Sequence, residues 1–167
     1  FPTRRSSDLV DRIKAHIALA ADLRTCVILG LIRGRGRPEE PPAEVRQRMT
    51  DGFRACAEEA EKFGVDLAVE PINRYETSLL NTVAETLEFL DLLQSPRVGL
   101  LLDTFHMNIE EPSIPASIRQ AGQRIKHVHV ADSNRWAPGF GHLDFAEVGR
   151  ELEALGYEGF LSAEILP

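Results

Sequence analysis

Four ionisable residues each lie at the end of an apolar run in this 167-residue sequence. Glu70 follows LAV, Asp103 follows VGLLL, His129 lies near the end of IKHVHV, and Glu164 follows GFLSA. Three carboxylates in one place repel one another unless a cation lies between them. Three oxygen ligands and one imidazole suit Mn²⁺, Mg²⁺ or Co²⁺ better than a structural zinc ion, which prefers sulfur and nitrogen. The residue types therefore predict a divalent metal site.

The segments that carry these residues alternate between strand and helix patterns. Short apolar runs without in/out alternation predict buried parallel strands, and spacings of three and four predict the helices between them. The expected strands are 26–32, 65–72, 97–107 (a strand that runs into a loop), 125–132 and 159–167. The expected helices are 10–24, 43–64, 81–93, 114–122 and 145–156. Gly64 is placed to end the second helix, Asn81 to cap the third and Asp144 to cap the last.

This alternation fits either a doubly wound open sheet or a (β/α) barrel. The loop at 33–42 contains RGRGR, but no G-x-G-x-x-G turn opens a helix. In a barrel, the carboxyl ends of all strands face one mouth, which would bring the four residues together. Taken singly, a carboxylate at a strand end is more often a helix cap or an ion-pair partner. Four in succession at matching positions favour the barrel and its metal site.

The neighbouring sequence resembles a known superfamily. AVEPINRYE, LLLDTFHMNIEE, HVHVADSNRWAPGFGHLDF and GFLSAEI are similar to motifs of the sugar phosphate isomerase/epimerase superfamily, whose fold is a xylose isomerase-like (β/α)8 TIM barrel. Within it, the chain most resembles the ketose 3-epimerases of the D-tagatose/D-psicose type and related keto sugar acid epimerases. The resemblance runs from about Val10 to Pro167. It implies an incomplete barrel of about five strands, which resemble the third to seventh.

The resemblance also implies roles for individual residues. Glu70, Asp103, His129 and Glu164 match the four ligands of one divalent ion, and Glu70 and Glu164 also match two acid/base carboxylates. We expect the ion to be Mn²⁺, with Mg²⁺ or Co²⁺ as alternatives. The residues that match substrate-binding positions are Glu76, His106 and Arg135. His127 lies on the same side of the strand as His129 and is the alternative ligand. Only His129 is followed six residues later by an arginine, Arg135.

This site would invert the carbon next to the ketone of a ketose or keto sugar acid. A divalent ion would stabilise the enediolate, while one glutamate removes the proton and the other returns one to the opposite face. The same fold and metal also leave open a hydroxypyruvate isomerase, an inosose dehydratase or an apurinic-site endonuclease. The endonuclease is disfavoured because it needs more zinc-ligating histidines and a basic DNA-binding face. An inactive barrel fragment is a further alternative.

Composition excludes several other classes of protein. The net charge of −7 disfavours nucleic-acid binding, because phosphate backbones repel an acidic chain. No apolar run reaches the ~18 residues of a membrane span. Cys26 and Cys56 do not make a disulfide framework, so we expect a reducing, cytoplasmic location. The expected partner is a small sugar, and the resemblance implies a homodimer or homotetramer.

The chain ends carry separate expectations. Residues 1–9 look like a translated sequencing adapter, with a real N-terminal arm as the alternative, so 10–167 is expected to be a TIM-barrel domain truncated at both ends. A complete barrel takes ~250 residues. Since an open barrel leaves bare apolar surface, we expect this polypeptide alone to fold poorly and to be inactive, and the full gene product to be an enzyme.

Overall fold

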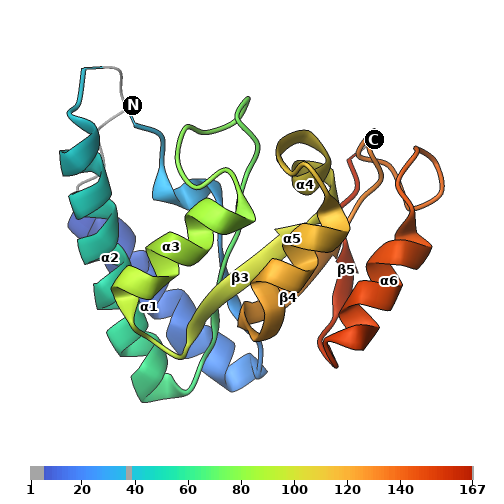
Figure 1. Ribbon diagram of the computed structural model, residues 1–167. Coiled ribbons are helices and arrows are strands. Elements are labelled where there is room, and N and C mark those ends of the chain that lie inside the picture. Colours follow the sequence, from blue (N-terminus) through green and yellow to red (C-terminus); the bar gives the residue numbers. More distant parts are fainter. Residues whose placement is uncertain (1–5, 37–38, 167) are drawn as a thin grey trace.

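The computed structural model describes residues 6–36 and 39–166 and contains one parallel five-stranded sheet. Its strands are β1 (Val27–Leu29), β2 (Leu67–Val69), β3 (Val98–Asp103), β4 (Ile125–Val130) and β5 (Leu161–Ala163). They lie side by side in sequence order, β1-β2-β3-β4-β5. A doubly wound sheet reverses direction at a switch point, whereas a barrel adds each strand beside the last. The order therefore supports the barrel, present here as five strands of an incomplete one (Figure 1).

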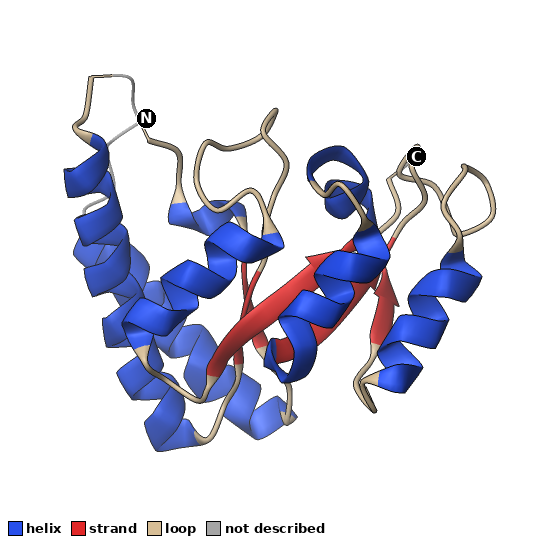
Figure 2. Ribbon diagram, in the orientation of Figure 1, coloured by secondary structure: helices blue, strands red, loops and turns tan. Residues whose placement is uncertain are grey.

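In the described ranges, six α-helices connect and cover these strands. They are α1 (Ser6–Leu23), α2 (Pro42–Phe63), α3 (Val83–Leu93), α4 (Thr104–Glu110), α5 (Ile114–Ala121) and α6 (Phe145–Ala154), with 3-10 turns at Leu31–Arg33 and Gly122–Arg124. Figure 2 shows α3 and α5 lying across one face of the sheet, in front of the strands. Every residue of β3 is buried, as a strand that is covered on both faces requires. Between α2 and α3, Phe53 and Phe89 pack edge to face at 5.1 Å.

Two local predictions were wrong. The segment after β3 was expected to be a loop, but Thr104–Glu110 is helical, because Asp103 caps it by accepting the Phe105 backbone N–H at 2.8 Å. Asn81 was expected to cap α3, but Thr82 does so by accepting the Glu85 N–H. The Asn81 amide instead donates to two loop carbonyl groups, those of Ile72 and Thr77.

Two other helix ends follow the sequence pattern. Gly64 ends α2 in the left-handed conformation, with φ 68°. This conformation costs glycine little conformational energy because glycine has no Cβ. Asp144 caps α6 by accepting the Glu147 N–H at 3.0 Å. These caps satisfy helix-end groups that would otherwise lack partners.

The pairing of β3 with β4 contains a bulge. Leu100 lies opposite Ile125, but the next residue, Leu101, lies opposite His127, so Lys126 is the extra residue. Gly99 lies beside it, where an added Cβ would approach the Arg124 carbonyl oxygen to 2.3 Å. The bulge brings Asp103 level with His129.

The two ends of the described chain show different environments. Helix α1 begins at Ser6, inside the stretch assigned to an adapter, and Leu9 packs against the core. The assignment of residues 1–9 stays a prediction, and residues 1–5 lie outside the described part. At the other end Phe160 and Leu166 are exposed beside the edge strand β5. Among the described residues, no helix is long and apolar enough to cross a membrane.

Candidate metal centre

The carboxyl ends of four neighbouring strands bring together the four residues predicted as metal ligands. One potential ligand atom from each of Glu70, Asp103, His129 and Glu164 lies within 4.8 Å of all the others. His129 Nδ1 is 3.7 Å from Glu70 Oε1 and 3.5 Å from Glu164 Oε2. The sheet fixes these positions, because the backbone N–H groups of Glu70 and Glu164 continue the strand ladder to the Leu29 and Val130 carbonyls.

The buried polar atoms of this cluster are unsatisfied within the described chain. Glu70 Oε1, Asp103 Oδ2 and His129 Nδ1 are all buried without a hydrogen-bond partner. Burying such atoms unpaired costs about 1–3 kcal/mol each. A divalent cation would accept lone pairs from all three, so the donor set fits a metal ion.

Electrostatics in the cluster point the same way. Burial, then the neighbouring Glu164 carboxyl, raises the pKa of Asp103 to about 7, although the Phe105 N–H opposes the shift. Burial alone would lower the pKa of His129, but Glu70 and then the Glu164 and Asp103 charges outweigh it and raise that pKa. The raised pKa of His129, and after burial that of Asp103, both include the effect of neighbouring carboxylates, whose negative charge a bound cation would neutralise.

The structure places the three predicted substrate-binding residues around the cluster. Arg135 Nη2 donates to Glu164 Oε2 at 2.9 Å, Nη1 is 3.9 Å from Glu76 Oε1, and the guanidinium carbon lies 4.6 Å from the centre of the Phe105 ring. The Arg135 backbone is left-handed, with φ 63°. A non-glycine residue in that conformation is held by its surroundings, which often marks a functional position.

His106 lies deeper, between the cluster and the loop after β2. Its Nε2 is 3.9 Å from Glu70 Oε1 and 3.8 Å from Asp103 Oδ2, and its Nδ1 is 2.8 Å from Asn73 Nδ2. Burial lowers the pKa of His106 despite the carboxylates beside it. This shift favours the neutral form of the imidazole.

His127, the alternative ligand, is not part of the cluster. Its Nε2 is 3.0 Å from the Ser162 hydroxyl, and its ring packs edge to face with that of His129 at 5.2 Å. It lies two residues earlier on β4, away from the carboxyl end of the strand. The spacing argument for His129 agrees with this placement.

Sequence reasoning missed Asp132, which is fully buried. Its carboxylate accepts the backbone N–H groups of Ser133, Gly139 and Leu143, all from the loop that carries Arg135. Burial alone would raise the pKa of Asp132, but these donors outweigh it and hold that pKa well below its ordinary value. The sequence signal that could have identified Asp132 is its position directly before a loop rich in Gly and Pro. The backbone N–H groups of such a loop need an acceptor when they are buried.

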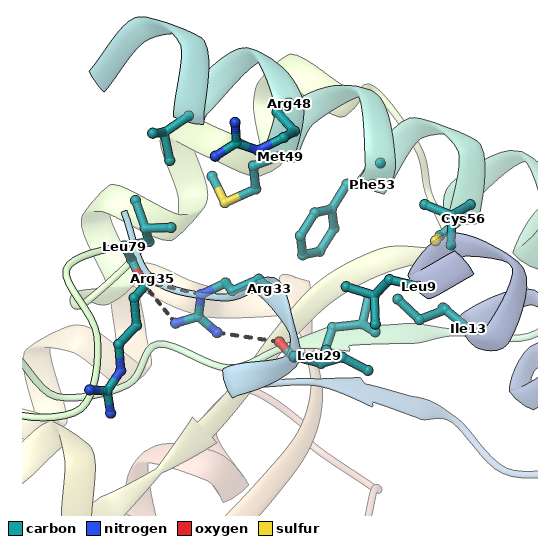
Figure 3. Close-up of a pocket in the computed structure, with 14 residues that line it drawn as sticks. Leu9, Ile13, Leu29, Arg33, Arg35, Arg48, Met49, Phe53, Cys56 and Leu79 are labelled. Carbon is teal, nitrogen blue, oxygen red and sulfur yellow. Dashed lines mark hydrogen bonds between the residues drawn. The ribbon is translucent and has the colours of Figure 1, made fainter. Parts of the chain in front are cut away.

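A separate cavity of about 110 Å³ lies between α1, α2 and β1, and no residue of the metal cluster lines it. Figure 3 shows Phe53 and Met49 on its α2 side, with the Arg33 guanidinium turned toward Leu29 and Leu79. Arg33 donates to the Gly30 carbonyl at 2.8 Å and the Leu79 carbonyl at 2.9 Å. Burial lowers its pKa to about 10. Arg33 is thus engaged in clamping two loops together.

Comparison with known proteins identifies the family. The model of the xylose isomerase-like TIM barrel family matches residues 2–167. An L-ribulose 3-epimerase of Mesorhizobium japonicum is 39% identical over 157 residues, which is 93% of this chain and 53% of that protein. A D-psicose 3-epimerase of Enterocloster bolteae is 43% identical over 114 residues, or 68% of this chain and 38% of that protein.

The solved structures agree. One of an L-ribulose 3-epimerase superposes with a TM-score of 0.87 at 36% identity, over 96% of this chain and 55% of that chain. The chain thus spans about half the length of the two L-ribulose 3-epimerases, and its match to the D-psicose 3-epimerase covers 38% of that protein. The family match, over residues 2–167, includes the whole described sheet and all four strand ends of the cluster. The chain belongs to the xylose isomerase-like TIM barrel family.

Proposed function

We propose that the full-length protein is a divalent-metal-dependent epimerase that inverts the carbon next to the ketone of a ketose or keto sugar acid. The observation that carries the proposal is the convergence of Glu70, Asp103, His129 and Glu164, with ligand atoms within 4.8 Å of one another and three of them buried without partners. The relatives named as ketose epimerases support the same class of reaction.

The four cluster residues would hold one ion. Their oxygen-rich set favours Mn²⁺, with Mg²⁺ or Co²⁺ as alternatives. When bound, such an ion would stabilise negative charge that develops on the substrate oxygens.

The chain's own groups would move the protons. Glu70 and Glu164 come from β2 and β5, with β3 and β4 between them. Carboxylates from separate strands can approach a small substrate from different sides, as inversion requires. In this proposal one removes the proton beside the ketone and the other returns one to the opposite face.

The remaining groups would orient the substrate. Arg135 contacts Glu164 and lies near Glu76. Its guanidinium can therefore donate a hydrogen bond to a substrate hydroxyl while it fixes the position of the Glu164 carboxylate. Glu76 and His106 add an acceptor and an imidazole on the Glu70 side. Binding by several fixed groups lowers the entropic part of the barrier.

The test follows deuterium exchange by NMR. The full-length protein, loaded with Mn²⁺, is incubated with a panel of ketohexoses and keto sugar acids in D₂O. We expect deuterium to enter at the carbon beside the ketone, together with formation of the epimer. Glu70→Gln and Glu164→Gln should each lower the rate by about 10²–10⁴-fold. The exposed Glu158→Gln is the matched control and should retain the rate.

A tightly bound ion without exchange in any sugar would contradict the epimerase proposal and favour another reaction of the same site, such as hydroxypyruvate isomerisation or inosose dehydration. Absence of metal binding would overturn the metal centre as well. A cytoplasmic location and a homodimeric or homotetrameric assembly stay predictions, which cell fractionation and light scattering can check.

A further inference from the structure

Asn73 lies between two groups of the proposed site, and its amide orientation is fixed twice. Asn73 Oδ1 accepts the Tyr75 backbone N–H at 3.0 Å, and a backbone N–H can only donate. Asn73 Nδ2 is 2.9 Å from Glu76 Oε1, and a carboxylate can only accept. The Tyr75 N–H requires an oxygen at one end of the amide, and the Glu76 carboxylate requires a nitrogen at the other end. Both contacts therefore give the same orientation of the Asn73 amide.

This orientation decides the tautomer of His106. The second hydrogen of Asn73 Nδ2 faces His106 Nδ1 at 2.8 Å, so Nδ1 must accept it with its lone pair. In a neutral imidazole, the proton then lies on Nε2. Asn73 and His106 are 2% and 3% exposed, so solvent cannot replace this partner.

The tautomer matters because of where Nε2 lies. It is 3.9 Å from Glu70 Oε1 and 3.8 Å from Asp103 Oδ2, two oxygens of the cluster that have no hydrogen-bond partner among the described residues. An Nε2 lone pair at this place could become a further nitrogen ligand to an ion. An Nε2–H cannot ligate, and instead offers a hydrogen bond to an oxygen that enters beside the carboxylates.

We propose that Asn73 is a positioning residue that holds His106 in the Nε2–H tautomer, which keeps His106 out of the metal ligand set and makes it a hydrogen-bond donor. The inference deepens the proposed function and rests on it only for the acceptor, a substrate oxygen. The tautomer and the exclusion from the ligand set depend on the hydrogen bonds of this chain alone. They can therefore be tested without turnover.

The first experiment records long-range ¹H–¹⁵N spectra of the metal-free, full-length protein labelled with ¹⁵N-histidine. The His106 signals are assigned by their loss in His106→Gln. We expect Nδ1 at the shift of an unprotonated ring nitrogen and Nε2 at that of a protonated one. A protonated Nδ1, or averaged shifts from both tautomers, would overturn the proposal.

A variant should reverse the pattern. In the double variant Asn73→Asp with Glu76→Gln, the new carboxylate at position 73 can accept a hydrogen bond from His106 Nδ1–H. The glutamine amide at position 76 can donate to the same carboxylate, which restores the hydrogen bond between positions 73 and 76 with its direction reversed. We expect Nδ1 to become protonated, and an Nδ1 that stays unprotonated would count against Asn73. Asn81→Asp is the matched control: it removes an amide that also donates twice, and should lower stability without changing the His106 tautomer.

Co²⁺ supplies a measurement that needs no folded double variant. If His106 stays outside the ligand set, His106→Gln should leave the visible spectrum of the Co²⁺-loaded protein unchanged. A change typical of a lost nitrogen ligand would overturn the proposal. Failure of the epimerase assay with the expected tautomer and Co²⁺ spectrum would remove the proposed function and leave the role of Asn73 intact.

Discussion

Asp103 and Asp132 are two buried carboxylates at the ends of adjacent strand segments, and their environments are opposite. Asp132 accepts several backbone N–H groups, and its pKa is held well below the ordinary value despite burial. Asp103 has one N–H donor for one oxygen, its Oδ2 has no hydrogen-bond partner in the described part of the chain, and burial raises its pKa to about 7. The described residues give the Asp132 carboxylate several N–H donors and leave one oxygen of Asp103 without a hydrogen-bond partner. For a buried carboxylate, the presence or absence of hydrogen-bond donors to its oxygens thus distinguishes a structural role from a candidate ligand role.

The largest effect is expected when the incomplete carboxylate is removed. Asp103→Asn should weaken Mn²⁺ binding by at least the roughly 10–100-fold that loss of an outer hydrogen-bond partner costs a metal site. The same variant should stabilise the metal-free protein by about 1–3 kcal/mol, because a neutral amide donor replaces a buried carboxylate oxygen beside Glu70 and Glu164, while the remaining asparagine oxygen keeps the α4 cap. Isothermal titration and denaturant unfolding measure the two effects. Equal metal affinity in Asp103→Asn and in the exposed Asp22→Asn would contradict the contrast.

The satisfied carboxylate should behave in the opposite way. Asp132→Asn should destabilise the protein by about 1–3 kcal/mol, because buried N–H donors lose their acceptor. Since the folded-state pKa is depressed, this contribution is complete above the unfolded pKa of ~4 and is lost as the pH falls toward the folded value. The stability gap between wild type and variant should therefore narrow from about pH 5 to pH 2. A gap that widens on acidification would refute the assignment.

Thr104 links the two regions and should give a smaller effect on both. Its hydroxyl donates to the Ala131 carbonyl at 2.6 Å and accepts the Ala131 N–H at 3.0 Å, joining the residue after Asp103 to the residue before Asp132. Thr104→Val should cost about 1–2 kcal/mol of stability and reduce Mn²⁺ affinity less than Asp103→Asn does. Thr104→Ser, which retains the hydroxyl, should recover most of the loss.

The smallest effect is expected away from both carboxylates. Gln94 ends α3 in the left-handed region, with φ 52°, and is exposed. Gln94→Gly should stabilise the protein by about 0.5–1 kcal/mol, since glycine adopts this conformation without a Cβ clash. Thermal unfolding should show the gain, with Mn²⁺ affinity unchanged. A change in Mn²⁺ affinity in Gln94→Gly would mean that global stability and metal binding are coupled. The effects of the Asp103 and Asp132 variants could then no longer be assigned to their local environments.

The sequence was sufficient to predict the order of the strands, five of the six described α-helices and the four strand ends, but not α4. Apolar runs and glycine stops are local signals, and parallel strands place their carboxyl ends together. The residues Glu70 and Glu164 could be placed in one cluster although 94 positions separate them (164 − 70).

What could not be predicted depended on competition between neighbouring residues or on contacts across loops. Asp103 acts as a helix cap as well as a cluster residue, so the pattern that identified it hid the start of α4. Asn81 and Thr82 are both good caps, and only the loop carbonyls that engage Asn81 decide between them. Asp132 gathers N–H groups from as far along as Leu143, which no local pattern reveals.

The bulge at Lys126 has a consequence for how this site tolerates the loss of single codons. Because Lys126 is the unpaired residue, its deletion would leave Leu101 opposite His127 and Asp103 opposite His129. Deletion of Val128, two positions later, would draw His129 back by one place and away from Asp103. For an evolving gene, the position of a lost codon on this strand matters more than the loss itself.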